Sequence, residues 1–277
     1  MKKSLTAATL FASLAMLTAC GDNSGTQAQA AQSAANMITI AGSTTVAPVT
    51  QALADAFVAS HPAYEVEVQT MGTGAGMTAT REGIADIGLA SRHLTADELT
   101  ELSYQTFAID GIAVVVNRDN TSVTNLSFED VQAIFLGEIT NWSQVGGEDQ
   151  NIIVVSREAG SGARGAFEDL ANIADQVAYD LIGTGSNGVL TSVEASQWAI
   201  GYVTYGLIAE RGVSALSIEN QPFSGAAALS GDYPFAIGFH MAYQSAAISE
   251  AARTFLDWVM SPAGQAVVSE QDYVAVN

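Results

Sequence analysis

The sequence predicts an α/β protein, because strand-like apolar segments alternate with helix-like amphipathic segments and short glycine-containing turns join them. Three such units recur, in which the segments 37–41, 64–69 and 152–155 each lead through a turn into a helical pattern. A fourth segment, 107–116, is apolar without alternation, which is typical of a strand covered on both faces. The chain from residue 37 onward suits one or two soluble α/β domains.

Residues 1–20 have the pattern of a lipoprotein signal peptide. Two lysines precede an apolar region, and the sequence Leu-Thr-Ala-Cys that ends at Cys20 resembles a bacterial lipobox, whose cysteine carries the lipid. A non-lipidated secretory signal and a short membrane anchor are the alternatives. Both are disfavoured, because the apolar run is too short to span a bilayer and Cys20 is the only cysteine.

The next segment, 21–36, is rich in Ala, Gln and Ser and predicts a flexible tether. We therefore expect an exported protein of the cell envelope. It would be held to a membrane by the lipid on Cys20 alone and would face the periplasm or the exterior.

The charge balance limits the partners. Both lysines lie in the signal peptide, so the rest of the chain has seven arginines against 29 acidic residues and a net charge of −22. Nucleic acid is excluded as a partner, because a phosphate backbone needs a basic surface. An anion would have to be bound by backbone N–H groups, by hydroxyls and by the few arginines, and four of these lie in or beside the glycine-containing turns: Arg81, Arg92, Arg157 and Arg164.

The segment 157–164, Arg-Glu-Ala-Gly-Ser-Gly-Ala-Arg, joins an apolar strand to an amphipathic helix. A helix N-terminus presents unpaired N–H groups and the positive end of the helix dipole, Ser161 adds a hydroxyl, and Arg157 can form two parallel hydrogen bonds to an oxyanion. The segment therefore predicts half of an anion site. The alternative is an ordinary strand-to-helix turn with a surface arginine.

Two further turns have the same character. The first contains Ser43, Thr44 and Thr45, more hydroxyls than one helix cap needs, and the second has the sequence Gly-Thr-Gly-Ala-Gly at 72–76. A dinucleotide site at the second turn is disfavoured, because the following helix is too short and the next acidic residue comes too early. The segment 86–92 predicts a short buried strand, and a local cap or ion pair is the alternative role of Asp86.

The remaining elements follow from periodicity and capping. Residues 126–136 predict a helix that begins with a capping box at Ser127 and Asp130. From 171 to 206 we expect a helix, a glycine-rich loop at 183–188, a second helix and a strand near 200–203. A strand at 235–241 and an amphipathic helix at 248–260 complete the chain.

Five motifs in this order resemble the phosphate-binding proteins of the high-affinity phosphate ABC transporter, the PstS family. The motifs lie at 41–48, 72–76, 85–92, 134–142 and 157–164. The resemblance implies a two-lobe periplasmic-binding-protein fold of type II, with mixed sheets flanked by helices and with hinge strands that cross between the lobes. Lobe 1 would comprise 37–112 and 232–277, and lobe 2 would comprise 113–231.

The resemblance also implies a phosphate site between the lobes. One half would lie on lobe 1, where Asp86 would accept a proton from the ligand, and the other half on lobe 2, where Ala163 stands in place of the usual Thr or Ser and offers only its N–H. Arg92 and Arg164 would either contact the ligand or orient Asp86. The implied site residues are Ser43, Thr44, Thr45, Thr73, Gly74, Asp86, Ser91, Arg92, Arg157, Ser161, Gly162, Ala163 and Arg164.

The function implied is that of a monomeric solute-binding protein that captures inorganic phosphate and delivers it to a membrane ABC permease, without a cofactor or a metal. A proton acceptor at Asp86 would favour phosphate over fully ionised sulfate, which has no proton to donate. A binding protein for sulfate or molybdate is the first alternative. A phosphatase with Ser161 or Thr44 as nucleophile is less favoured, because the three histidines lie outside the motifs and no metal-ligand cluster is visible.

Overall fold

The computed structural model describes residues 36–276. The predicted signal peptide with Cys20, and the tether except for Asn36, lie outside the described residues. Within 36–276, no helix is both long enough and apolar enough to cross a membrane.

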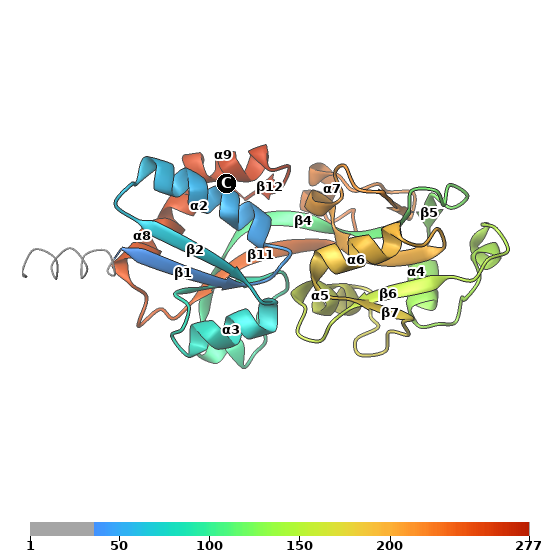
Figure 1. Cartoon of the computed structure of the whole chain (residues 1–277), viewed down its shortest axis with the longest axis horizontal. Helices are drawn as coiled ribbons and strands as arrows, with labels where there is room; N and C mark the ends of the chain where they lie inside the picture. The colour runs from blue at the N-terminus through green and yellow to red at the C-terminus, as the bar shows by residue number, and fades with distance from the viewer. Residues whose placement is uncertain (1–35, 277) are drawn as a thin grey trace, which may run out of the picture.

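The described chain forms two lobes that share one long strand, β4 (Ser103–Asn117) (Figure 1). In one lobe β4 pairs with β11 (Ala236–Tyr243), and in the other it pairs with β8 (Ala199–Thr204), in both cases antiparallel. The side chains of β4 from Ile112 to Val116 are completely buried, which confirms the prediction of a strand covered on both faces. This shared strand gives the two-lobe mixed α/β architecture that was predicted.

The sheet of the first lobe places three parallel strands side by side in the order β2 (Glu65–Thr70), β1 (Met37–Gly42) and β3 (Ile87–Ala90), followed by β11 and β4. The sheet of the second lobe continues from β4 through β8 and β6 to β7, and these last three strands are parallel. The other strands are β5 (Asn125–Leu126), β6 (Ile153–Arg157), β7 (Leu181–Gly183), β9 (Val213–Ala215), β10 (Ser217–Ile218) and β12 (Val274–Ala275).

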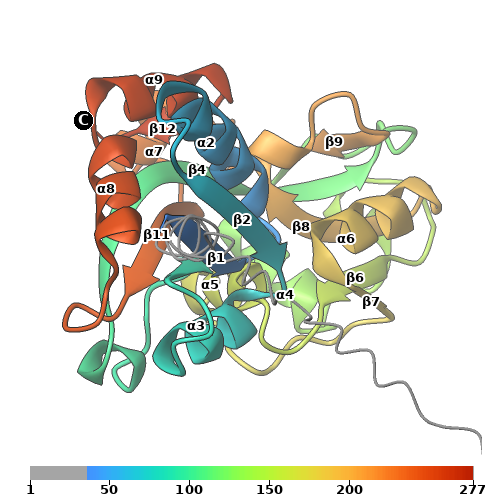
Figure 2. The ribbon, with the colours of Figure 1, turned by 60° about the vertical axis from the view of Figure 1, so that its left-hand side comes forward.

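Helices cover the sheets of both lobes (Figure 2). The helices of the first lobe are α2 (Ala47–Ser60), α3 (Thr73–Arg81), α8 (Glu250–Val259) and α9 (Pro262–Glu270). Those of the second lobe are α4 (Phe128–Phe135), α5 (Gly162–Leu170), α6 (Gly185–Glu194) and α7 (Gly225–Ser230). Short 3₁₀ helices lie at Glu98–Thr100 (η1), Trp142–Val145 (η2) and Tyr205–Leu207 (η3).

Local sequence signals explain many of the helix starts. The capping box at Ser127 and Asp130 is present at the start of α4, with each side chain bonded to the backbone of the other residue. Pro48 lies in the first turn of α2, where its missing N–H costs no helical hydrogen bond.

The segment after α5 differs from the prediction. The expected helix beyond Ala171 is absent from the described chain, because α5 ends there and Asn172 and Asp175 take left-handed backbone angles, with φ of 55° and 58°. The chain then forms β7, an edge strand. The glycine-rich stretch 183–188 is the turn from this strand into α6 rather than a loop between two helices.

Candidate functional site

The turns at the N-terminal ends of α2, α3, α5 and α6 meet where the two lobes touch (Figure 1). The N–H of Gly74 donates to the carbonyl of Gly160 in the other lobe at 3.1 Å. A Cβ added at Gly162 would lie 2.1 Å from Thr73 Oγ1, and one added at Gly185 would lie 3.8 Å from Thr44 Oγ1. Since helix N-termini attract negative charge, this arrangement suits a small anion held between the lobes.

Parallel strand ends produce this meeting point. Strands β1, β2 and β3 end at one edge of the first lobe's sheet, and the turns that follow them contain the hydroxyl residues of the predicted site. Strands β6 and β7 end in the same way in the second lobe and lead into α5 and α6. The carboxyl ends of parallel strands are the usual place for ligand sites in α/β proteins.

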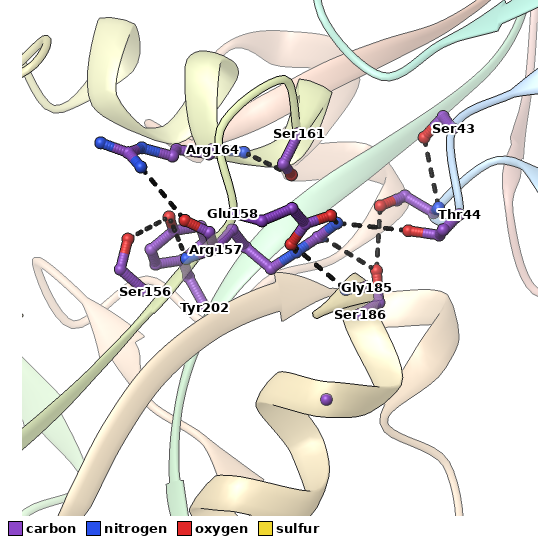
Figure 3. Close-up of polar contacts among 12 residues, drawn as sticks. Ser43, Thr44, Ser156, Arg157, Glu158, Ser161, Arg164, Gly185, Ser186 and Tyr202 are labelled. Carbon is purple, nitrogen blue, oxygen red and sulfur yellow. Dashed lines mark hydrogen bonds and ion pairs between the residues drawn. The ribbon is translucent and has the colours of Figure 1, made fainter. Parts of the chain in front are cut away.

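Arg157, the last residue of β6, is the central cation of this region. Its side chain is 1% exposed, and its guanidinium points toward Thr44 across the lobe boundary and toward Ser186 in its own lobe (Figure 3). Nη2 lies 3.3 Å from Thr44 Oγ1 and Nη1 lies 3.3 Å from Ser186 Oγ. The Nη1 and Nη2 edge of the guanidinium therefore faces hydroxyl groups from both lobes.

Glu158 holds the other edge of the guanidinium. Its two carboxylate oxygens accept hydrogen bonds from Arg157 Nε and Nη2, both at 2.9 Å, and Oε2 also accepts from the N–H of Gly185 at 3.2 Å. Burial by itself raises the pKa of the Glu158 carboxyl, but the hydrogen bonds and the charge of Arg157 outweigh burial and leave this pKa below its ordinary value. The ionised carboxylate fixes the orientation of the guanidinium.

Buried hydroxyls surround the lobe 1 side of this point. Ser43 Oγ donates to Ser91 Oγ at 3.0 Å and accepts from the N–H of Thr45 at 3.2 Å, and the N–H of Ser91 donates to Thr73 Oγ1 at 3.4 Å. These four side chains are each at most 2% exposed. The structure thus brings together the predicted residues from three separate turns of lobe 1.

The α5 turn brings the predicted lobe 2 residues to the same place. Ser161 is the N-cap, and its Oγ accepts from the N–H of Arg164 at 3.2 Å. Within residues 36–276, the N–H groups of Gly162 and Ala163 in the first turn of α5 have no protein acceptor. Both lie at the lobe boundary as free donors.

Arg92 and Arg164 lie close to the site but are held by other carboxylates. Arg92 forms a fork with Glu98, with two N–O distances of 2.8 Å, and Arg164 Nε lies 2.6 Å from Glu168 Oε1. Arg164 also donates to the carbonyl of Arg157 and points away from Thr44 (Figure 3). Neither guanidinium bonds to Asp86, so the expectation that they orient this residue is wrong.

The predicted role of Asp86 requires a correction. Asp86 precedes β3, whereas Ser91 follows it, so the five residue steps between them span about 16 Å of extended chain. Its carboxylate accepts the N–H of Thr39 at 2.9 Å and the hydroxyl of Ser249 at 3.3 Å. Asp86 is thus a structural residue at the far edge of the sheet and cannot accept a proton from a ligand at the lobe boundary.

Ser186, Gly185 and Glu158 belong to the site but were not predicted as site residues. The signal for Ser186 was present, because Thr-Gly-Ser follows strand β7 and precedes α6 in the same strand–turn–helix pattern as the other motifs. The strand itself, Leu181–Gly183, has only three residues and was expected to be helix. Glu158 is part of the 157–164 motif, but no role was predicted for it.

A cavity of about 430 Å³ opens between α2 and α6, and Thr44, Gly185 and Ser186 are among its lining residues. It therefore leads from the surface to the hydroxyls that face Arg157. Among residues 36–276, no group of three or more His, Cys, Asp and Glu side chains could hold a metal ion.

Comparison with known proteins agrees with this arrangement. The family model described as the PBP superfamily domain matches residues 26–263. The phosphate-binding protein PstS of Bacillus subtilis (strain 168) is 30% identical over 287 residues, which cover 99% of this chain and 95% of the relative. PstS of Borreliella burgdorferi is 26% identical and covers 87% of this chain and 90% of its own length.

Two solved structures are also similar. A putative phosphate ABC transporter substrate-binding protein from Clostridium perfringens, with bound phosphate, has a TM-score of 0.84 at 33% identity and covers 87% of this chain and 100% of its own. An ABC-type phosphate transport receptor from Vibrio cholerae has a TM-score of 0.72 at 34% identity, with coverage of 86% and 99%. The chain belongs to the PBP superfamily and, within it, to the PstS family of phosphate-binding proteins.

Proposed function

We propose that this protein captures inorganic phosphate between its two lobes and delivers it to a membrane ABC permease. The observation that carries the proposal is the buried guanidinium of Arg157, whose outer edge faces hydroxyls from both lobes where four helix N-termini meet. A small tetrahedral oxyanion matches this set of donors in size and charge. The names of the relatives, which are phosphate-binding proteins, support phosphate as that anion.

The proposed phosphate contacts come from both lobes. Lobe 1 would contribute Ser43, Thr44, Thr45, Thr73 and Ser91, with the Gly74 turn beside them, and lobe 2 would contribute Arg157, Ser161, Gly162 and Ala163. Since the ligand would link donors on both sides, binding would favour the closed arrangement of the lobes. We keep 37–112 with 232–277 and 113–231 as the proposed extents of the two lobes.

Asp86 bonds to Thr39 and Ser249 outside the site and therefore cannot distinguish phosphate from sulfate. Glu158 is the carboxylate that adjoins the guanidinium, and both of its oxygens already accept hydrogen bonds from Arg157. Measured affinities for phosphate and sulfate therefore test the selectivity directly. Sulfate and molybdate are the alternative ligands that such a measurement includes.

A binding role fits the described residues better than catalysis. Ser161 acts as the N-cap of α5 and Thr44 contacts Arg157. Within residues 36–276, neither hydroxyl bonds to a histidine that could serve as a base. We propose that the protein is a solute-binding protein and not a phosphatase, as the names of its relatives also indicate. We also propose that it acts as a monomer outside the cytoplasm, held to a membrane by a lipid on Cys20.

Calorimetric titration of the purified protein with phosphate, sulfate and molybdate tests the ligand. We expect tight binding of phosphate and much weaker binding of the other two anions. Binding of sulfate as tight as that of phosphate would overturn the assignment, as would the absence of heat with phosphate. A parallel assay with a chromogenic phosphate ester should detect no turnover, and turnover that disappears in Ser161→Ala would support the phosphatase instead.

A further inference from the structure

Ser186 connects the two lobes through a single buried hydroxyl. It lies in the first turn of α6 and is buried, with 3% exposure. Its Oγ lies 3.0 Å from Thr45 Oγ1 in lobe 1. The same oxygen lies 3.3 Å from Arg157 Nη1 in lobe 2 (Figure 3). No other hydroxyl in the described chain bonds both to a lobe 1 hydroxyl and to the guanidinium.

The hydrogen bonds of Arg157 define where an oxyanion can lie. Glu158 occupies the Nε and Nη2 edge, so a ligand that takes two parallel hydrogen bonds has to use the Nη1 and Nη2 edge. Thr44 and Ser186 flank that edge at 3.3 Å each, which is longer than the usual 2.7–3.2 Å for such bonds. An oxyanion on this edge would therefore lie within reach of both hydroxyls.

Two other features of α6 point to the same place. Within residues 36–276 the N–H of Ser186 has no protein acceptor, and the N-cap Thr184 makes no side-chain cap to the helix. Ser186 also lines the cavity of about 430 Å³ that opens beside Thr44. The residue thus offers a free N–H and a hydroxyl at the positive end of a ten-residue helix.

The α5 turn lacks one hydroxyl donor, because residue 163 is alanine where the family usually has Thr or Ser. Ala163 is 1% exposed and has only a methyl group, so α5 contributes the Ser161 hydroxyl and backbone N–H groups. A hydroxyl that approaches from α6 instead lies on the same side of the lobe boundary as Arg157.

We propose that Ser186 is a further anion-contacting residue, whose hydroxyl and N–H donate to the oxyanion held by Arg157. This inference rests on the proposed function, since it names an additional contact of the same site. It assigns to α6 a direct part in binding, alongside the turns before α2, α3 and α5. The Thr45–Ser186 hydrogen bond then also joins the contact to lobe 1.

Titration calorimetry with inorganic phosphate on the purified protein and its variants tests the contact. Ser186→Ala should raise the Kd about tenfold, the effect expected for loss of one hydrogen bond to a charged group, whereas Ser186→Thr, which keeps the hydroxyl, should recover most of the affinity. Ser192→Ala is the matched control, because Ser192 lies on the same helix and its hydroxyl bonds only to the Gly188 carbonyl. Unchanged thermal melting of the variants without phosphate shows that each is folded.

A second comparison separates a ligand contact from a link between the lobes. If Ser186 acts only through its hydrogen bond to Thr45, Ser186→Ala should have no effect on the Kd in a Thr45→Val background. We expect Ser186→Ala to raise the Kd several-fold in that background as well. If Ser186→Ala leaves the Kd unchanged in the wild-type or in the Thr45→Val background, the inference is overturned. Binding of phosphate by the wild-type protein would still support the proposed function. Failure of the wild-type protein to bind phosphate would overturn the function itself.

Discussion

Gly162 of α5 packs directly against Thr73 of α3 across the lobe boundary, so closely that a Cβ at position 162 would lie 2.1 Å from Thr73 Oγ1 and 2.5 Å from Ser91 Oγ. Both hydroxyls belong to fully buried residues of lobe 1. The lobes can therefore meet as they do only because residue 162 has no side chain.

We expect Gly162→Ala to weaken phosphate binding roughly tenfold or more. The added methyl group overpacks the contact, and such overpacking costs about 1–3 kcal/mol in well-packed interiors. Titration calorimetry measures the effect. Gly165→Ala is the matched control on the same helix, because a Cβ there meets only Arg92 Cδ at 3.4 Å, and equal losses in the two variants would contradict the role of the lobe contact.

Arg157→Lys should raise the Kd for phosphate about a hundredfold. Lysine keeps the charge but cannot form the fork with Glu158 and two outer hydrogen bonds at the same time. Arg211→Lys provides the comparison, since Arg211 forms a similar fork with Glu194 at the protein surface. If the two variants bind phosphate equally well, Arg157 is not the anchor of the site.

The same arginine also contributes to stability, because it is completely surrounded by protein. Removal of the side chain in Arg157→Ala would leave Glu158 without its cationic partner, so we expect a loss of stability in addition to a loss of binding. Urea denaturation in the absence of phosphate measures this contribution. A variant as stable as the wild type would show that Glu158 finds another partner or water.

Asp86→Asn should leave both the Kd for phosphate and the ratio of phosphate to sulfate affinity within about twofold of the wild type. The carboxylate bonds to Thr39 and Ser249 at the edge of the sheet away from the lobe boundary. Asp86→Ala should lower the free energy of unfolding by about 1 kcal/mol, since it leaves the Thr39 N–H without this acceptor. A large change in anion selectivity would return Asp86 to the binding site.

Asp110 predicts a pH dependence of stability. Asp110 lies on β4 and is 1% exposed. Its carboxylate accepts hydrogen bonds from the N–H groups of Gly111 and Gly206, at 2.7 and 3.2 Å. Burial raises its pKa to about 7, although these N–H groups act in the opposite direction. Three tyrosines, Tyr205, Tyr233 and Tyr273, are close enough for their own pKa to be raised in part by its charge.

Because the folded state binds the Asp110 proton up to about pH 7 and the unfolded state releases it near pH 4, this group lowers the free energy of unfolding as the pH rises between these values. The expected loss is about 1.4 kcal/mol per pH unit. Urea denaturation from pH 4.5 to 8 should show Asp110→Asn gaining stability relative to the wild type as the pH rises. Asp232→Asn controls for the loss of one negative charge, and parallel curves for wild type and Asp110→Asn would contradict the assignment.

The sequence predicted the parts of the site that depend on local chemistry. A strand followed by glycine and hydroxyl residues and then by a helical pattern is visible at 37–53, 64–81 and 152–170, and each gave the expected strand and helix. The predicted capping box at Ser127 and Asp130 also depends only on neighbours within three residues. The family followed from these motifs in their order.

The predictions for Asp86 and for the segment after Ala171 were wrong, because both depend on the three-dimensional arrangement of the chain. Asp86 and Ser91 are close in the sequence but lie at opposite ends of β3, and the motif alone does not say which end faces the other lobe. The helix expected after Ala171 failed because Asn172 leaves the helical backbone region, and with it the short strand before α6 was missed.

By itself, the sequence determined the fold class, the family and the turns that supply hydroxyl and backbone donors, because helix capping and strand patterns are interactions between near neighbours. Only the tertiary structure decided which charged groups meet. It paired Arg92 with Glu98, and it left the outer edge of Arg157 facing Thr44 and Ser186. These contacts join residues on different elements or lobes, so they depend on how the sheets place the strand ends. The pair Arg164–Glu168 is instead local, because both residues lie one turn apart on α5.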